Sequence, residues 1–212
     1  QGPLKPHVPG HLRFSTVLHV LHFNQYLHII SFTRRKQIHE ETWGKQQELW
    51  AEVILGFCET ERVFTLDSEK LEDSPPFYNT TISRIDVFVL KSIFIIDVGR
   101  VSGDMIKELL TYLASTGNAE QLNKSVFLIY WKKPTEWADL ITDYVQRAGL
   151  AGSVVTVYEL FMADEAASEP FHGLPDIMWP RVFRALERSG KAALFGVEPT
   201  AKITSETGIK FS

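Results

Sequence analysis

The sequence predicts an α+β fold, mainly helical, in which one order of elements occurs twice along the chain. Apolar residues recur at helical spacing in several segments of each half. The last predicted helix of each half ends at a glycine, and two short apolar strands separated by polar residues follow that glycine. With 212 residues, of which 44% are hydrophobic, the chain can bury one ordinary core or two small ones.

The first predicted helix runs from Thr42, as N-cap, to about Glu61. Its apolar face repeats at intervals of three and four residues: Trp43, Gln46, Trp50, Val53, Ile54 and Phe57. The single cysteine, Cys58, falls on this face, so packing in the core is favoured over a catalytic thiol. One cysteine also allows no internal disulfide and no cysteine zinc cluster.

The rest of the first half predicts two more helices and a hairpin. The motif "SPPFYN" (Ser74–Asn79) indicates a turn into a short helix, because proline fixes φ and is tolerated in a first turn. The third helix is predicted from about Ser102 to Ser115, with Gly117 just beyond its end. Strands near Ala119–Leu122 and at 126–131 ("VFLIYW") then form the hairpin. Three helices and a hairpin make a winged-helix unit.

The second half repeats this order. Pro134 opens a helix that Gly149 closes, and "SVVTVYEL" (153–160) predicts a strand that leads into a second helix. The third helix is predicted from about Pro175 to Ser189. Pro180 lies inside it and is expected to kink the helix or delay its start.

Two short strands, "KAALF" (191–195) and "GIKFS" (208–212), complete the second unit. The chain is therefore predicted to contain two winged-helix domains, at 42–133 and 134–212. Residues 1–41 look atypical, since they hold six of the seven histidines and more basic than acidic residues. They are predicted not to belong to the fold.

Residues 85–100 have no place in a winged helix, and they are predicted to be an insertion into the first domain. This apolar stretch is too short for a transmembrane helix and carries Asp86, Lys91 and Asp97. Two interpretations stay open. The stretch is either an error in the gene model, such as a translated intron, or a functional insertion.

The charge pattern argues against nucleic-acid binding, the main alternative function for winged helices. The formal net charge is −4. The third helix of the first domain carries Asp104 and Glu108 against Lys107, which would repel phosphate. Residues 134–212 hold seven Lys and Arg against eleven Asp and Glu.

No group of residues predicts catalysis, a cofactor site or a metal site. The carboxylates Glu136, Asp139 and Asp143 lie at helical spacing and are typical of surface charge. His172 sits in a loop, where packing is favoured over catalysis. There is no phosphate-binding glycine loop and no serine elbow. The sequence therefore predicts a protein that is not an enzyme.

Several ordered blocks carry a resemblance to a known family: "KQQELWAEVILGFC", "SPPFYNTTISR", "FLIYWKKPTEWADLI", "SVVTVYEL", "FHG", "RALERSGKAALF" and "GIKFS". Together they resemble the smallest subunit of the endosomal sorting complex ESCRT-II, the vacuolar protein sorting protein twenty-five family. The resemblance runs from about Thr42 to Ser212 and implies tandem winged helices in a non-enzymatic adaptor.

The resemblance also implies partners and a location. The first domain would dock on the two other ESCRT-II subunits, with two copies per complex, and the second would recruit the first ESCRT-III subunit. The protein would be cytoplasmic and would reach the endosomal membrane only through the complex. Family members typically carry a Pro-Pro-aromatic-aromatic anchor before the first helix, whereas this chain has "SFTRRKQIHEE" (31–41) there. Docking is therefore expected to be weaker.

Two sets of residues are candidate partner contacts. Arg181, Arg184 and Arg188 recur at intervals of three and four, so they line one helical face that could pair with an acidic partner helix or simply be solvated. Pro75, Pro76 and Phe77 could bind a proline-recognising domain or could instead begin the second helix.

Overall fold

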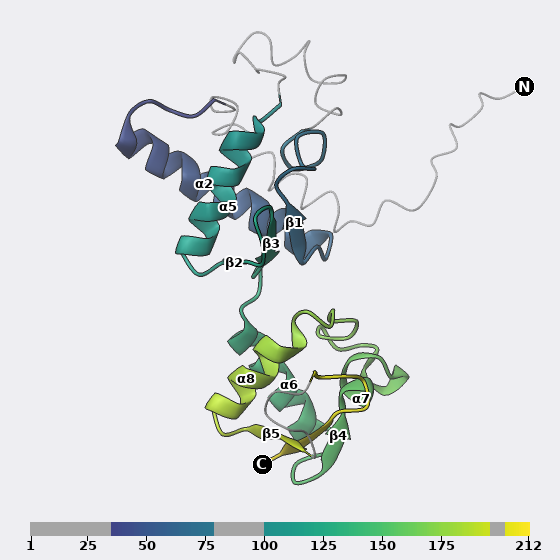
Figure 1. Cartoon of the computed structure of the whole chain (residues 1–212). Coiled ribbons are helices and arrows are strands. Elements are labelled where there is room, and N and C mark those ends of the chain that lie inside the picture. Colours follow the sequence, from purple (N-terminus) through teal and green to yellow (C-terminus); the bar gives the residue numbers. More distant parts are fainter. Residues whose placement is uncertain (1–34, 79–99, 196–201) are drawn as a thin grey trace, which may run out of the picture. The chain divides into compact units, whose positions relative to one another are not determined.

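The computed structural model describes residues 35–78, 100–195 and 202–212. The chain divides into two compact units between Ile129 and Tyr130 (Figure 1). The first contains α2 (Glu40–Thr60), β1 (Thr65–Asp67), α5 (Gly103–Ser115), β2 (Ala119–Gln121) and β3 (Val126–Ile129). The second contains α6 (Pro134–Arg147), β4 (Val154–Thr156), α7 (Val157–Phe161), the 3₁₀ helix η1 (Asp164–Ala166), α8 (Trp179–Arg188), β5 (Ala192–Phe195) and β6 (Gly208–Phe211).

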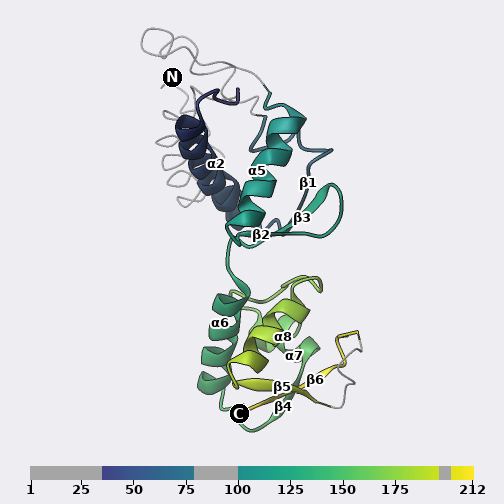
Figure 2. The same cartoon turned by 60° about the vertical axis from the view of Figure 1, so that its left-hand side comes forward.

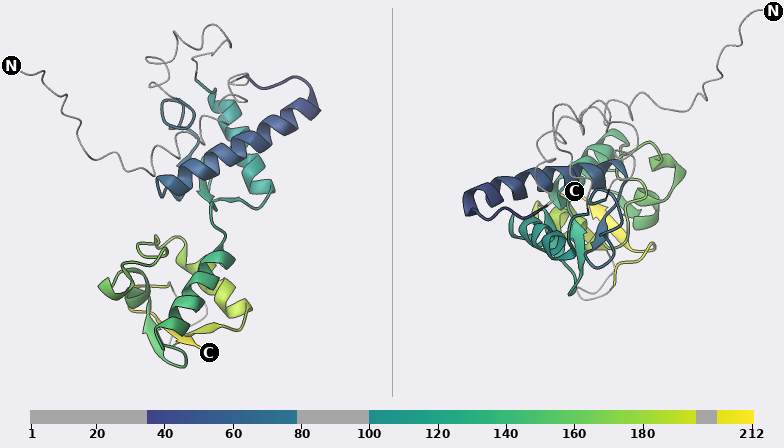
Figure 3. Two further views of the ribbon diagram at one scale, coloured as in Figure 1. Left: turned by 180° about the vertical axis from the view of Figure 1, so that it is seen from behind. Right: turned by 90° about the horizontal axis from the view of Figure 1, so that it is seen from above.

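The first unit packs α2 across α5, as the view from behind shows (Figure 3). Its sheet has the order β1-β3-β2, with both pairs antiparallel. The sequence did not predict β1, a strand of three residues. Leu66 of β1 is buried and lies opposite Phe127 of β3, so tertiary pairing creates this strand.

The helix α2 begins at Glu40, so the predicted start at Thr42 was wrong. His39 is the N-cap residue, and Glu40 and Glu41 occupy the first turn. Carboxylates there face the positive end of the helix dipole, which stabilises this earlier start. These two residues, assigned by sequence to the atypical N-terminal segment, thus belong to the helix.

The helix α5 confirms the predicted end signals. Ser102 caps its start, where the hydroxyl oxygen accepts a hydrogen bond from the Met105 N–H. Gly117 follows its end with a φ of +72°, a conformation that glycine adopts without steric cost. The Asn118 N–H then donates to the Leu113 carbonyl at 2.9 Å. The strand predicted at 126–131 is shorter than expected, because β3 ends at Ile129.

The predicted second helix after Tyr78 and most of the predicted insertion lie outside the described residues. Arg100, the last residue assigned to that insertion, is described. Its guanidinium lies 2.6 Å from an Asp73 carboxylate oxygen and 5.5 Å from the centre of the Tyr78 ring. Arg100 thus contacts residues that precede the undescribed segment, and the insertion itself stays a prediction.

The second unit packs α6 and α8 against each other beside a sheet of order β4-β6-β5 (Figure 2). Its core is aromatic, with the ring of Phe161 stacked on Trp179 and in contact with Phe171 and Phe183. Pro134 is the first residue of α6, as predicted, and Gly149 follows its end with a φ of +69°. Among the described residues of both units, no helix is long and apolar enough to cross a bilayer.

The helix α8 begins late, at Trp179, as the position of Pro180 led us to expect. Pro180 occupies the second helical position, where the missing N–H would have had no partner within the helix. The preceding residues form a turn in which the Met178 N–H donates to the Pro175 carbonyl at 2.9 Å. The helix predicted to start at Pro175 is therefore one turn shorter at its beginning.

Candidate partner-binding surfaces

The helix α8 has one face buried in the core and another exposed to solvent. Trp179, Val182, Phe183 and Leu186 are buried. Arg184 and Arg188 are exposed and lie four residues apart, so they share one face. Within the described part of the chain, neither has an ion-pair partner. Two cationic side chains are thus available to an acidic partner.

Arg181 differs from the other two arginines. Its side chain is half-buried, and its guanidinium donates a hydrogen bond to the Ile177 carbonyl at 2.8 Å. It therefore holds the turn that precedes α8. The predicted row of three arginines separates into one residue with a structural contact and two exposed residues.

The three residues of the Pro75-Pro76-Phe77 tract also differ in their exposure to solvent. Phe77 is 1% exposed, and its ring stacks on Trp50 with the ring centroids 5.8 Å apart. Such a residue cannot reach a partner while the unit is folded, which removes Phe77 from the candidate contacts. Pro75 is exposed and Pro76 is half-buried, so only the prolines remain at the surface.

An apolar surface on the outer face of the second sheet was missed by sequence reasoning. Val154 of β4 and Phe195 of β5 are 48% and 58% exposed. They flank Gly208 of β6, where an added Cβ would lie 3.1 Å from Val154 Cγ1 and 3.6 Å from Phe195 Cβ. The strand alternation could have found them, because Val155 and Ile209 are buried on the opposite face.

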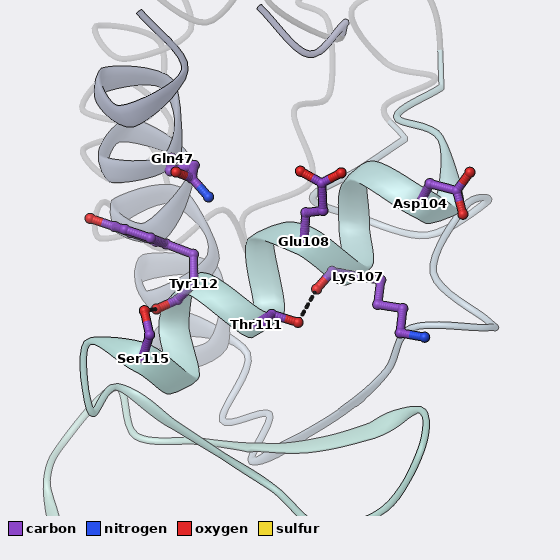
Figure 4. A pocket seen from close by; sticks show the side chains of 7 residues that line it. All are labelled: Gln47, Asp104, Lys107, Glu108, Thr111, Tyr112 and Ser115. Carbon is purple, nitrogen blue, oxygen red and sulfur yellow. Dashed lines mark hydrogen bonds between the residues drawn. The ribbon is translucent and has the colours of Figure 1, made fainter. Parts of the chain in front are cut away.

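An open hollow of about 650 Å³ lies beside α5 (Figure 4). Gln47 of α2 lines it together with Asp104, Lys107, Glu108, Thr111, Tyr112 and Ser115 of α5. Its two aliphatic hydroxyls donate to the backbone, Thr111 to the Lys107 carbonyl at 2.7 Å and Ser115 to the Tyr112 carbonyl at 2.8 Å. Thr111 and Ser115 thus form hydrogen bonds within α5.

Three reactive groups elsewhere are also used in the fold: the thiol of Cys58 and the carboxylates of Asp139 and Glu136. Cys58 is buried, and burial raises the pKa of its thiol to about 12. The Asp139 carboxylate accepts from the Lys191 ammonium at 2.7 Å, and the Glu136 carboxylate accepts from the Lys133 N–H at 2.6 Å. In the described ranges, no three His, Cys, Asp or Glu side chains gather as a metal site would require.

Two units that each combine helices with a three-stranded antiparallel sheet place the chain in the class of tandem winged-helix proteins. The family model described as "ESCRT-II complex subunit" matches residues 30–175. The chain belongs to this ESCRT-II subunit family, in the group of vacuolar protein-sorting-associated protein 25. Members of this group are adaptor subunits and not enzymes, in agreement with the sequence.

Relatives of that name occur in distant organisms. The protein of Xenopus laevis is 31% identical over 173 residues, which cover 81% of this chain and 87% of the relative. The protein of Danio rerio is 34% identical over 160 residues, covering 74% and 83%. The protein of Dictyostelium discoideum is 31% identical over 209 residues, covering 91% and 96%.

Solved structures show the same fold. The crystal structure of subunit VPS25 of the endosomal trafficking complex ESCRT-II has a TM-score of 0.65 at 21% identity, covering 86% of this chain and 96% of that one. A chain in the crystal structure of endosomal complex ESCRT-II (VPS22/VPS25/VPS36) has a TM-score of 0.63 at 19% identity, covering 88% and 99%. The predicted pair of winged helices is thereby confirmed.

Proposed function

We propose that this chain is an assembling subunit of an ESCRT-II complex, in which it docks through its first domain on the counterparts of VPS22 and VPS36. Its second domain recruits the first ESCRT-III subunit, and its contact with the endosomal membrane is indirect, through the complex. The family match over residues 30–175 supports this proposal most directly, because it includes the whole first domain.

The surface of α5 supports protein docking over nucleic-acid binding. Asp104 is exposed, and the Glu108 carboxylate already binds the Lys36 ammonium at 2.6 Å. Lys107 is the one cationic side chain on this helix, so its surface offers no basic stripe to a phosphate backbone. A winged helix that binds a groove of DNA through this helix would need the opposite charge.

Co-expression with the VPS22 and VPS36 counterparts tests the assembly. Native mass spectrometry of the purified complex should find two copies of this chain for each copy of the other subunits. The affinity should be lower than that of the Danio rerio relative assayed with its own partners, because the proline-aromatic anchor is missing. Recovery of this chain as a lone monomer, under conditions where the relative assembles, would contradict the proposal.

The family resemblance implies that the second domain recruits ESCRT-III, and the exposed cationic pair of Arg184 and Arg188 on one helical face is our candidate contact. An amphipathic helix with acidic residues fits such a surface, and charge complementarity acts mainly on the association rate. The double variant Arg184→Glu/Arg188→Glu should therefore associate several-fold more slowly with the first ESCRT-III subunit. Its association rate should also depend less on the salt concentration. Stopped-flow measurements at two salt concentrations provide the test.

The matched control is Lys202→Glu, which reverses another exposed cation of the second domain. Assembly with the other ESCRT-II subunits should be intact in all these variants. Normal recruitment by the double variant would remove α8 from the site. The variant Val154→Asp/Phe195→Asp then tests the outer sheet face as the contact surface.

A further inference from the structure

Thr135 differs from every other serine and threonine of the chain in the charges that precede it. In the whole sequence it is the one hydroxyl residue with a basic residue at both the third and the second position before it, which are Lys132 and Lys133. Thr135 lies outside the exposed face of α8 to which recruitment is assigned, so a role for it is independent of the proposed function.

The position of Thr135 in α6 leaves its side chain accessible. The hydroxyls of Thr60, Thr111 and Thr142 each donate to the carbonyl four residues earlier in the same helix. Thr135 cannot form this internal hydrogen bond, because it is the second residue of α6 and the helix contains no carbonyl four residues before it. Its side chain is exposed to solvent.

The two lysines lie on backbone outside the helix. Lys133 is exposed and has extended backbone angles, with a φ of −68° and a ψ of 153°. The Lys132 ammonium lies 5.6 Å from the centre of the Trp137 ring, a surface contact that is weak enough to be exchanged for another partner. Both cations can therefore be bound by carboxylates of another protein that also reaches Thr135.

We propose that Thr135 is a phosphorylation site, modified by a protein kinase that selects basic residues before the acceptor. The Thr135 Oγ1 attacks the γ-phosphorus of ATP, the bond from this phosphorus to the oxygen that bridges it to the β-phosphorus breaks, and ADP leaves. The hydroxyl proton passes to the catalytic aspartate of the kinase. The product carries about −1.5 to −2 charges at pH 7, which offset the positive charges of Lys132 and Lys133.

The folded unit can carry this phosphate. The carboxylates nearest in sequence are already bound, since Glu136 accepts from the Lys133 N–H at 2.6 Å and Asp139 accepts from the Lys191 ammonium at 2.7 Å. The phosphate would also lie in the first turn of α6, where negative charge is favoured by the helix dipole. Phosphorylation of Thr135 therefore does not require the second unit to unfold.

Phosphorylation of the purified full chain by the catalytic subunit of protein kinase A, with ATP, tests the site. Mass spectrometry should find one added phosphoryl group and locate it on Thr135. Thr135→Ala should receive no phosphate, and Thr135→Ser should accept it. A phosphate located on another residue, or equal labelling of Thr135→Ala, would overturn the proposal.

The selection of basic residues is tested by removing them. Lys132→Ala/Lys133→Ala should be phosphorylated about tenfold more slowly, because it lacks the charges that the kinase binds. The matched control is Lys202→Ala/Lys210→Ala, which removes two exposed cations elsewhere in the second unit and should leave the rate unchanged. Equal rates for both double variants would contradict the assigned class of kinase.

A destabilised variant shows whether the kinase acts on the folded chain. Phe183→Ala leaves a cavity in the core of the second unit and raises the fraction of unfolded chains, while the residues around Thr135 stay the same. The wild-type chain and Phe183→Ala should be phosphorylated at the same rate. A rate that rises many-fold in Phe183→Ala would show that Thr135 is reached only in the unfolded chain, and the proposal would fail.

Discussion

At the residue scale, burial determines what Cys58 can do. Its side chain is 0% exposed on α2, and the apolar surroundings raise the pKa of the thiol to about 12. The native protein should therefore not react with a thiol reagent such as DTNB at pH 8, whereas the chain unfolded in guanidinium should release one equivalent of chromophore. Fast reaction of the native protein would mean that the helix opens locally at this position.

The start of α7 depends on a reciprocal pair of hydrogen bonds. The Glu159 carboxylate accepts from the Thr156 N–H at 2.6 Å and from its hydroxyl at 2.7 Å, and the Thr156 hydroxyl oxygen accepts from the Glu159 N–H at 3.2 Å. The backbone hydrogen bond from Thr156, followed by that from its hydroxyl, lowers the pKa of Glu159 below its ordinary value. Both residues therefore contribute to the cap.

This lowered pKa predicts a pH dependence. A depressed pKa in the folded state stabilises the protein above the unfolded pKa of about 4.3, and the contribution is lost as the pH falls through the folded value. Glu159→Gln should thus lower the free energy of unfolding at pH 7, and its difference from wild type should shrink in acid. Urea denaturation at several pH values measures this. Glu165→Gln in η1, an exposed position, is the control for the loss of one carboxylate.

Thr156→Ala removes the side-chain part of the same cap. It should cost about 1 kcal/mol of unfolding free energy at neutral pH. The same urea denaturation series measures it. A loss near zero would show that solvent replaces the Thr156 hydroxyl at the start of α7.

At the scale of elements, Pro180 does not break α8, because it lies in the first turn of the helix. Because it stands at the second helical position, Pro180→Ala should change the free energy of unfolding by less than about 1 kcal/mol. Arg184→Pro, in the middle of the same helix, should cost about 3 kcal/mol or more. Chemical denaturation compares the two, with Arg184→Ala as the control for the lost side chain. A large loss for Pro180→Ala would contradict this account.

At the scale of the whole molecule, each unit has a core of its own. In the second unit Phe161 of α7 contacts Trp179 and Phe183 of α8 and also Phe171, whose ring contacts Tyr144 of α6. Residues 130–212 produced alone should therefore fold, with a cooperative thermal transition and dispersed amide signals in NMR spectra. Phe183→Ala should destabilise this fragment by about 3–5 kcal/mol. A fragment without cooperative unfolding would show that it needs the first unit.

Local signals determined most of the described helices. Pro134 and Gly149 mark the two ends of α6, and Ser102 and Gly117 mark those of α5. The position of Pro180 predicted the late start of α8. These residues act through their own φ angles or through hydrogen bonds to neighbours a few positions away, so a linear sequence displays them fully. The resemblance blocks likewise identified the family without any coordinates.

Long-range contacts determined what the sequence did not reveal. The strand β1 exists because it pairs with β3 some sixty residues later, and Phe77 is removed from the surface because Trp50 stacks on it. Among the candidate contacts, the hydrogen bond of Arg181 to the turn before α8 separates it from Arg184 and Arg188. Periodicity reports which face of an element a residue occupies. Which neighbour covers that face is decided when distant segments pack, because burial and pairing are properties of the tertiary contacts.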